Sequence, residues 1–136
     1  MTARAYFADT WYFIATIDRF DDHHRRAIAA REATRGAVIV THDSVLTEVL
    51  AYFSRAGVHG RRLAVEGVRD AMRRFDVVLV DRPLFLRAVT RYEQRPDKEY
   101  SLVDCMSMVV MEERGITHVL TNDHHFSQAG LTVVNQ

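Results

Sequence analysis

Short apolar, β-prone runs alternate with longer stretches of helical periodicity along the whole chain, and this alternation restricts the possible fold more than any other feature. The runs that we predict as strands are 5–8, 37–40, 77–80, 116–120 and 131–134. Parallel strands need long crossover connections, which helices usually supply. The pattern therefore predicts an α/β protein, a three-layer α/β/α sandwich with a central, mostly parallel sheet of about five strands.

The sequence also marks where the helix before the fourth strand begins and ends. Ser101 and Asp104 form the S-x-x-D pattern of a capping box, in which each side chain bonds the other residue's backbone. The helix is expected to run to about Glu113 and to be closed by Gly115, because glycine favours the position after a helix. Beyond the fourth strand, residues 121–126 are expected to form a loop.

Size and composition are typical of one globular domain. The 136 residues are 48% hydrophobic, which suits a single core, so we predict one domain over 1–136. No apolar stretch approaches the roughly 20 residues of a membrane-spanning helix, and the N-terminus lacks the features of a secretory signal. Cys105 is the only cysteine, so no intrachain disulfide can form. We therefore expect a cytoplasmic protein without membrane association.

Charge is balanced, with 18 basic and 18 acidic residues, so the chain is not the basic body that tight nonspecific nucleic-acid binding favours. Arginines nevertheless cluster in one stretch, at Arg55, Arg61, Arg62, Arg69, Arg73 and Arg74. Arginine forks suit phosphate oxygens, and arginines also commonly solvate the outer face of a helix. An RNA-binding surface and a solvated helix face are both open interpretations.

Four acidic residues stand where an open sheet of this kind usually binds its ligand, in the crevice outside the carboxyl ends of the strands. Asp9 directly follows the first predicted strand, and Asp123 lies just beyond the fourth. Glu48 lies in the helix after the second strand, and Asp104 opens the helix that leads into the fourth. We expect all four side chains to reach one cleft.

Each acid also has an ordinary structural explanation. Asp9 and Asp104 could cap the helices that follow them. Glu48 could be an exposed helix residue, and Asp123 could be a turn residue. The helix around Asp104 is apolar on nearly every side, which predicts that it is buried. A buried carboxylate is neutralised by backbone donors and the helix dipole, or by a metal ion that it shares with other acids.

Four short motifs carry a resemblance to a known family. They are Y-F-A-D-T-x-x-F at 6–13, V-L-T-E-V at 45–49, S-L-V-D-C at 101–105 and L-T-N-D-x-x-F at 120–126. In their order and spacing the chain resembles the PIN-domain ribonucleases, in particular toxins of the VapC type. The last two motifs are the most specific. The resemblance implies a single PIN-like nuclease domain over 1–136.

The resemblance further implies a metal-dependent endoribonuclease that hydrolyses RNA phosphodiester bonds. The catalytic and metal-binding residues would be Asp9, Glu48, Asp104 and Asp123, with Thr10, Ser101, Thr121 and Asn122 in support. Two like charges about 4 Å apart repel by roughly 4 kcal/mol at an effective dielectric of about 20, and bound Mg²⁺ or Mn²⁺ removes that repulsion. The implied partners are an RNA substrate, the small antitoxin of a type II toxin–antitoxin pair and a second copy of the chain in a homodimer.

Two other functions stay open. One is a noncatalytic α/β module that binds RNA or a protein through its arginine-rich helices, and the other is a structure-specific DNA nuclease that uses the same acids. Metal-dependent cleavage, compared on RNA and DNA, separates them. His124 and His125 suggest zinc, but no second Cys or His group stands at finger or ribbon spacing, so no structural zinc is expected. Asp43 and Asp81 also lie near strand ends and are interpreted as caps.

Overall fold

The strands form one five-stranded sheet in the order β3-β2-β1-β4-β5, and every neighbouring pair is parallel. The computed structural model describes residues 4–134. Its strands are β1 (Ala5–Ala8), β2 (Val38–His42), β3 (Asp76–Val78), β4 (His118–Leu120) and β5 (Thr132–Val133). The predicted central parallel sheet is therefore confirmed, although most strands are shorter than the apolar runs that predicted them.

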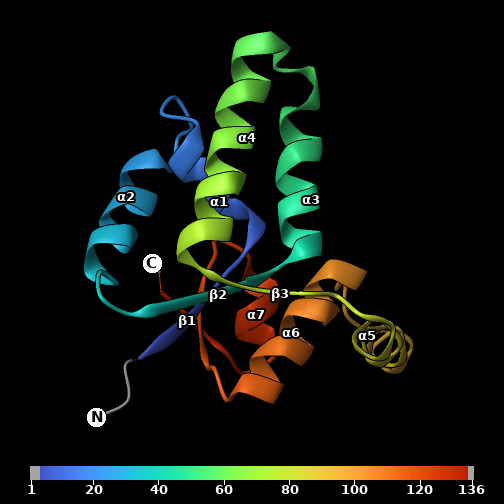
Figure 1. Cartoon of the computed structure of the whole chain (residues 1–136). Coiled ribbons are helices and arrows are strands. Elements are labelled where there is room, and N and C mark those ends of the chain that lie inside the picture. Colours follow the sequence, from blue (N-terminus) through green and yellow to red (C-terminus); the bar gives the residue numbers. More distant parts are fainter. Residues whose placement is uncertain (1–3, 135–136) are drawn as a thin grey trace.

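Helices cover both faces of this sheet, which confirms the predicted three-layer sandwich (Figure 1). On one face lie α1 (Thr10–Ile17), α2 (His24–Ala33), α3 (Asp43–Tyr52) and α4 (Gly57–Arg74), with the short 3₁₀ helix η1 (Phe53–Arg55) between the last two. On the other lie α5 (Arg82–Gln94), α6 (Leu102–Arg114) and α7 (His124–Gln128). The paired helices α3 and α4 extend well beyond the sheet. None of the helices described is long and apolar enough to span a bilayer.

The strand order reverses beside β1. The chain passes from β1 to β2 and β3 on one side and then returns to β4 on the other side of β1. The backbone N–H of Asp9 donates to the carbonyl oxygen of Leu120 at 3.2 Å, so the ends of β1 and β4 are joined at this point. Such a reversal opens a crevice at the carboxyl ends of the two strands, because their crossover helices lie on opposite faces. Asp9 and Asp123 both lie at that crevice.

Helix α6 is buried along most of its length, as its apolar sequence predicts. Both halves of the predicted capping box are present: Ser101 Oγ accepts from the N–H of Asp104, and Asp104 Oδ2 accepts from the N–H of Ser101, each at 3.0 Å. Gly115 ends the helix with φ of 65°, a conformation that glycine adopts without strain. Asp104 is therefore fixed in the first turn of a helix that belongs to the hydrophobic core.

Residues 121–126 do not form a loop throughout, and that prediction is wrong for their second half. Helix α7 begins at His124, because Asp123 Oδ1 accepts a hydrogen bond from the N–H of His125 at 2.9 Å and caps the helix. Phe126, the fully buried residue of α7, anchors the helix to the core. One helical turn thus follows directly on Asp123.

The cap of α3 also differs from expectation. Asp81 caps α5 as predicted, through a 3.0 Å hydrogen bond from the N–H of Leu84. In α3 the capping residue is His42, whose Nδ1 accepts from the N–H of Val45 at 3.3 Å. Burial lowers the pKa of His42 to about 4, so the imidazole is neutral and keeps the lone pair that this role requires. Asp43 instead accepts from the N–H of Val80 at 3.1 Å.

Candidate active site

A cleft of about 630 Å³ lies at the carboxyl ends of β1 and β4, and all four predicted acids line it. Seven of the eight predicted site residues belong to its wall: Asp9, Thr10, Glu48, Ser101, Asp104, Asn122 and Asp123. The eighth, Thr121, is buried and donates from Oγ1 to Asp9 Oδ2 at 2.8 Å. Residues that are separated by more than 110 positions in the sequence are thus brought into contact by the sheet.

Asp9 occupies the position before α1, yet its side chain makes no capping hydrogen bond to that helix. The carboxylate is 6% exposed and is held by Thr121. Burial, opposed by the backbone of Thr10 and the Thr121 hydroxyl and reinforced by the charges of Asp104 and Glu48, raises the pKa of Asp9 from 3.8 to about 7. Capping therefore does not explain Asp9, whose ionised form is unfavourable without a cation.

Glu48 reaches the cleft from α3. Its Oε1 accepts a hydrogen bond from Thr10 Oγ1 at 2.5 Å, which joins the start of α1 to the middle of α3. Tyr52 lies one turn further along α3 and also lines the cleft. Glu48 is therefore part of the site wall and not simply an exposed helix residue.

Asp104 and Asp123 do cap helices, but each uses only one carboxylate oxygen for that role. Asp104 Oδ2 accepts from Ser101, and Asp123 Oδ1 accepts from His125. Among residues 4–134, the second oxygen of each has no hydrogen-bond donor, and the same holds for Oε2 of Glu48. Carboxylate oxygens of residues that line one cleft form the ligand set that hard divalent cations prefer. Capping and metal binding are therefore compatible in these residues.

The comparison with protein families agrees with this geometry, since the model described as "PIN domain" matches residues 6–131. This chain belongs to the PIN-domain family. It is 30% identical over 129 residues to the 23S rRNA-specific endonuclease VapC20 of Mycobacterium tuberculosis, a match that covers 94% of this chain and 96% of that protein. The family resemblance expected from the four motifs is confirmed.

Several solved structures share the fold. The crystal structure of M. tuberculosis VapC20, described as a sarcin-ricin loop cleaving toxin, superposes with a TM-score of 0.83 at 29% identity and covers 96% of this chain and 98% of that one. VapBC2 from Rickettsia felis gives 0.69 over 96% and 98% of the two chains, and FitAcB from Neisseria gonorrhoeae gives 0.70 over 95% and 96%, both at 15% identity. The two more distant matches support the fold alone.

Sequence reasoning missed several residues of this PIN-domain cleft. Trp11, Ile14, Asp21, Tyr52, Glu99, His124 and His125 also line it. His125 Nδ1 lies 3.2 Å from both Asp104 Oδ2 and Asp123 Oδ1. In the sequence His125 stands two residues after Asp123. That spacing indicates a contact between the two side chains only once the helical turn of α7 is known.

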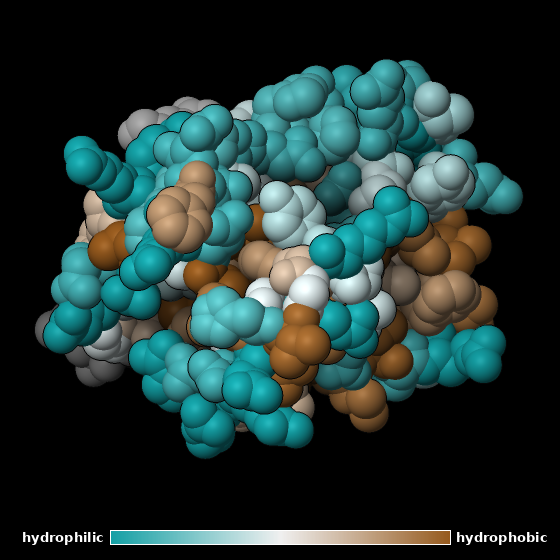
Figure 2. Space-filling model, turned by 90° about the horizontal axis from the view of Figure 1, so that it is seen from above, coloured by the Kyte–Doolittle hydropathy of each residue, from teal (hydrophilic) through white to brown (hydrophobic). Residues whose placement is uncertain are grey.

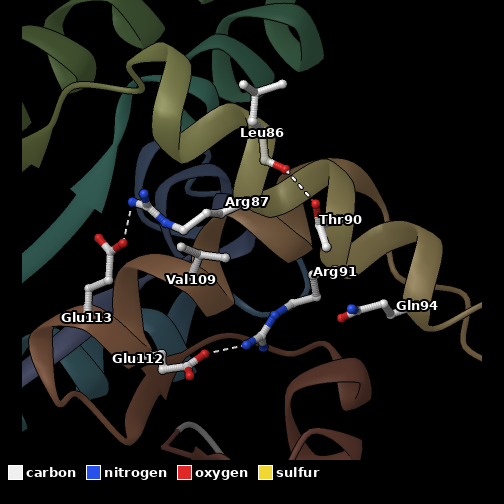
Figure 3. A pocket seen from close by; sticks show the side chains of 8 residues that line it. All are labelled: Leu86, Arg87, Thr90, Arg91, Gln94, Val109, Glu112 and Glu113. Carbon is white, nitrogen blue, oxygen red and sulfur yellow. Dashed lines mark hydrogen bonds and ion pairs between the residues drawn. The ribbon is translucent and has the colours of Figure 1, made fainter.

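A second hollow, of about 460 Å³, lies between α5 and α6 (Figure 3). Arg87 pairs with Glu113 and Arg91 with Glu112 across it, and Thr90 Oγ1 donates to the Leu86 carbonyl at 3.2 Å. Its charged side chains are thus matched in pairs, unlike the crowded acids of the first cleft. The acidic cleft is the better candidate for the PIN-domain active site.

The predicted arginine cluster lies on and beside α4, where all six side chains are exposed. Arg73 and Arg74 pair with Asp70, and Arg61 Nη1 donates to the carbonyl of Ser54 at 2.9 Å. Part of the cluster therefore solvates or braces the α3–α4 pair, while Arg55, Arg62 and Arg69 present exposed guanidinium groups.

Proposed function

We propose that this PIN-domain protein is a metal-dependent endoribonuclease and the toxin of a type II toxin–antitoxin pair. The observation that carries the proposal is the convergence of four acids in one cleft at the β1–β4 reversal. The 30% identity to a 23S rRNA-specific endonuclease supports RNA as the substrate class. We also propose that residues 1–136 form one nuclease domain that acts in the cytoplasm, which suits a chain with a single, buried cysteine.

Asp9, Glu48, Asp104 and Asp123 would hold Mg²⁺ or Mn²⁺, because their ligand atoms are hard oxygens. Three of these acids keep an oxygen without a hydrogen-bond donor in the part of the chain that the structure describes. A bound cation supplies an acidified water and stabilises charge on the phosphate. Thr10 would orient Glu48, Thr121 would orient Asp9, and Ser101 would fix Asp104 through the capping box. Asn122, whose amide oxygen accepts from Arg26 at 3.3 Å, would tie α2 to the rim of the cleft.

The direct test is cleavage of ribosomal RNA by the purified protein with and without metal. We expect cleavage at discrete positions with Mn²⁺, none with EDTA, and recovery when Mn²⁺ is restored, because the uncompensated acids repel the phosphate. Primer extension maps the ends. Matched DNA oligonucleotides should stay intact.

Three other outcomes would contradict the proposal. Cleavage in excess EDTA contradicts the metal-dependent site. Equal cleavage of DNA and RNA favours a structure-specific DNA nuclease, and RNA binding without cleavage favours the noncatalytic module.

The proposed antitoxin would be a small protein that covers the acidic cleft. An arginine side chain suits this role, because its bonds to carboxylates are bidentate and strong. The likeness to M. tuberculosis VapC20, whose structure is that of a toxin, supports such a partner. The cleft walls would then bind either RNA with metal or the antitoxin.

We further propose a homodimer formed through an apolar row on α5. Phe85, Leu86, Val89 and Tyr92 lie on one face of this helix, at 37–55% exposure. Leu79, at 71% exposure, directly follows the edge strand β3, in the segment that leads into α5. One of the apolar patches in Figure 2 lies on the right, the side on which Figure 1 places α3 and α5. An exposed row of this extent is typical of an interface between proteins.

The double variant Leu86→Glu/Val89→Glu should shift the protein from dimer to monomer, because each buried glutamate would lose its hydration at the interface. Light scattering coupled to size exclusion measures the mass. Gln94→Glu, on the same helix but outside the row, serves as control and should stay dimeric. A monomeric wild-type protein, or a double variant that remains a dimer, would refute this interface.

A further inference from the structure

The side chain of His125 lies between two of the site acids, Asp104 and Asp123. Its Nδ1 lies 3.2 Å from Asp104 Oδ2 and 3.2 Å from Asp123 Oδ1. Two donor atoms that each lie about 2.1 Å from one cation, at a right angle, are separated by roughly 3.0 Å. The imidazole nitrogen is therefore about as far from each carboxylate as one ligand of an ion is from its neighbour. Both oxygens also accept the capping hydrogen bonds, and each keeps a second lone pair.

The imidazole of His125 is held in this place by the fold. Its backbone N–H donates to Asp123 at 2.9 Å, and its ring contacts the edge of the buried Tyr100 at a centroid distance of 5.7 Å and an angle of 74°. Only 16% of the His125 side chain is exposed. A donor fixed by packing and hydrogen bonds needs little reorganisation to bind an ion, which favours affinity.

The adjacent histidine provides a natural contrast. His124 Nδ1 lies 3.9 Å from Asp123 Oδ1, and 74% of its side chain is exposed. The donor atoms of Asp123, His124 and His125 all lie within 4.8 Å of one another, whereas Asp104 stands outside this group and contacts it through His125. Only His125 is directed between two acids by the helix turn, and His124 is left on the rim.

We propose that His125 Nδ1 joins Asp104 and Asp123 in a mixed nitrogen and oxygen site that selects Mn²⁺ or a similar transition-metal ion over Mg²⁺. This inference rests on the proposed metal-dependent nuclease. Imidazole nitrogen binds first-row transition metals well, whereas Mg²⁺ strongly prefers oxygen ligands and water. With its hydrogen on Nε2, the imidazole would offer the Nδ1 lone pair to the ion. The competing explanation is that His125 only donates a hydrogen bond to the acids.

The test compares His125→Asn with the matched control His124→Asn in the full chain. Titration calorimetry gives the Mn²⁺ and Mg²⁺ affinities, and pulsed electron paramagnetic resonance of the Mn²⁺-loaded protein detects coupling to a ligand nitrogen. We expect His125→Asn to lose roughly 10- to 100-fold in Mn²⁺ affinity, with Mg²⁺ affinity little changed. The nitrogen coupling should vanish in this variant and persist in His124→Asn.

Wild-type protein labelled with ¹⁵N-histidine makes the test independent of whether a variant folds, because the coupling frequency changes only if a histidine binds the ion. Mn²⁺ binding without nitrogen coupling overturns the role of His125 and leaves the nuclease proposal intact. Coupling that is lost in His124→Asn but kept in His125→Asn also overturns it. Absence of any Mn²⁺ binding to the wild-type protein refutes both proposals.

Discussion

Asp9→Asn is expected to abolish RNA cleavage and at the same time to stabilise the metal-free protein at neutral pH. Loss of a metal ligand removes several kcal/mol of transition-state stabilisation, a rate decrease of roughly 1,000-fold or more. The opposite effect on folding follows from burial. The rise in the pKa of Asp9 from 3.8 to about 7 corresponds to a cost of at most roughly 4 kcal/mol for keeping the carboxylate ionised in the fold.

The sign of the pH dependence follows from linkage. Because the folded protein binds the Asp9 proton more tightly than the unfolded chain, the stability from this group is fully present below pH 3.8 and is lost as the pH rises through about 7. His42 acts in the opposite direction: its pKa is lowered from 6.5 to about 4, so its contribution is lost as the pH falls through that window. His42 is common to both proteins and cancels in their difference.

Urea unfolding in EDTA measures this effect. The free energy of unfolding of Asp9→Asn should exceed that of the wild type above pH 7, and the difference should shrink towards pH 4. Asp81→Asn is the matched control, because Asp81 is an acid beyond a strand end that caps α5, a role that asparagine also performs. This control should keep full activity. Cleavage by Asp9→Asn, or a lower stability than the wild type at pH 7.5, would contradict the assignment.

The second large effect is a steep pH dependence of metal binding. A cation that binds Asp9 must displace its proton, so Mn²⁺ affinity should be roughly 25-fold weaker at pH 5.5 than at pH 7.5 and should level off above that. Saturating Mn²⁺ should correspondingly stabilise the fold by about 2.7 kcal/mol at a concentration of 100 times Kd. The increase in folding stability on Mn²⁺ binding should be largest above pH 7, where the ionised Asp9 most destabilises the metal-free protein.

Calorimetry in two buffers of different ionisation enthalpy counts the released protons. Near pH 6 the uptake of Mn²⁺ should release close to one proton for Asp9. Glu48→Gln keeps the buried Asp9 and should still release this proton, although it binds Mn²⁺ more weakly. An affinity that does not change between pH 5.5 and 7.5 would show that Asp9 is not a buried ligand.

The sequence predicted those features that depend on local pattern. The apolar runs located the strands, the S-x-x-D pattern located the cap at Ser101, and the strand ends placed Asp9 and Asp123 at one edge of the sheet. Each of these follows from a periodicity or a cap that neighbouring residues alone determine. The strand order, which puts β1 beside β4, was not predicted from the sequence.

The features that were missed depend on contacts between distant segments. The hydrogen bond from Thr121 to Asp9 spans 112 positions, and it is this contact that distinguishes Asp9 from a capping residue. Helix α7 escaped prediction because it spans only His124–Gln128, too short for a periodic signal, and is held by the burial of Phe126. Without that turn, His125 had no predictable position relative to Asp104.

The bond between the Asp9 amide and the Leu120 carbonyl fixes one dimension of the cleft. The two chain segments that carry Asp9 and Asp123 leave adjacent rungs of the same ladder, so their separation is set by strand spacing, which no side-chain replacement can alter. Tyr52, Glu99 and His124, by contrast, are carried by a helix, a connecting segment and a short terminal turn. Substitutions at these three residues are therefore expected to change the cleft wall without changing the spacing of Asp9 and Asp123.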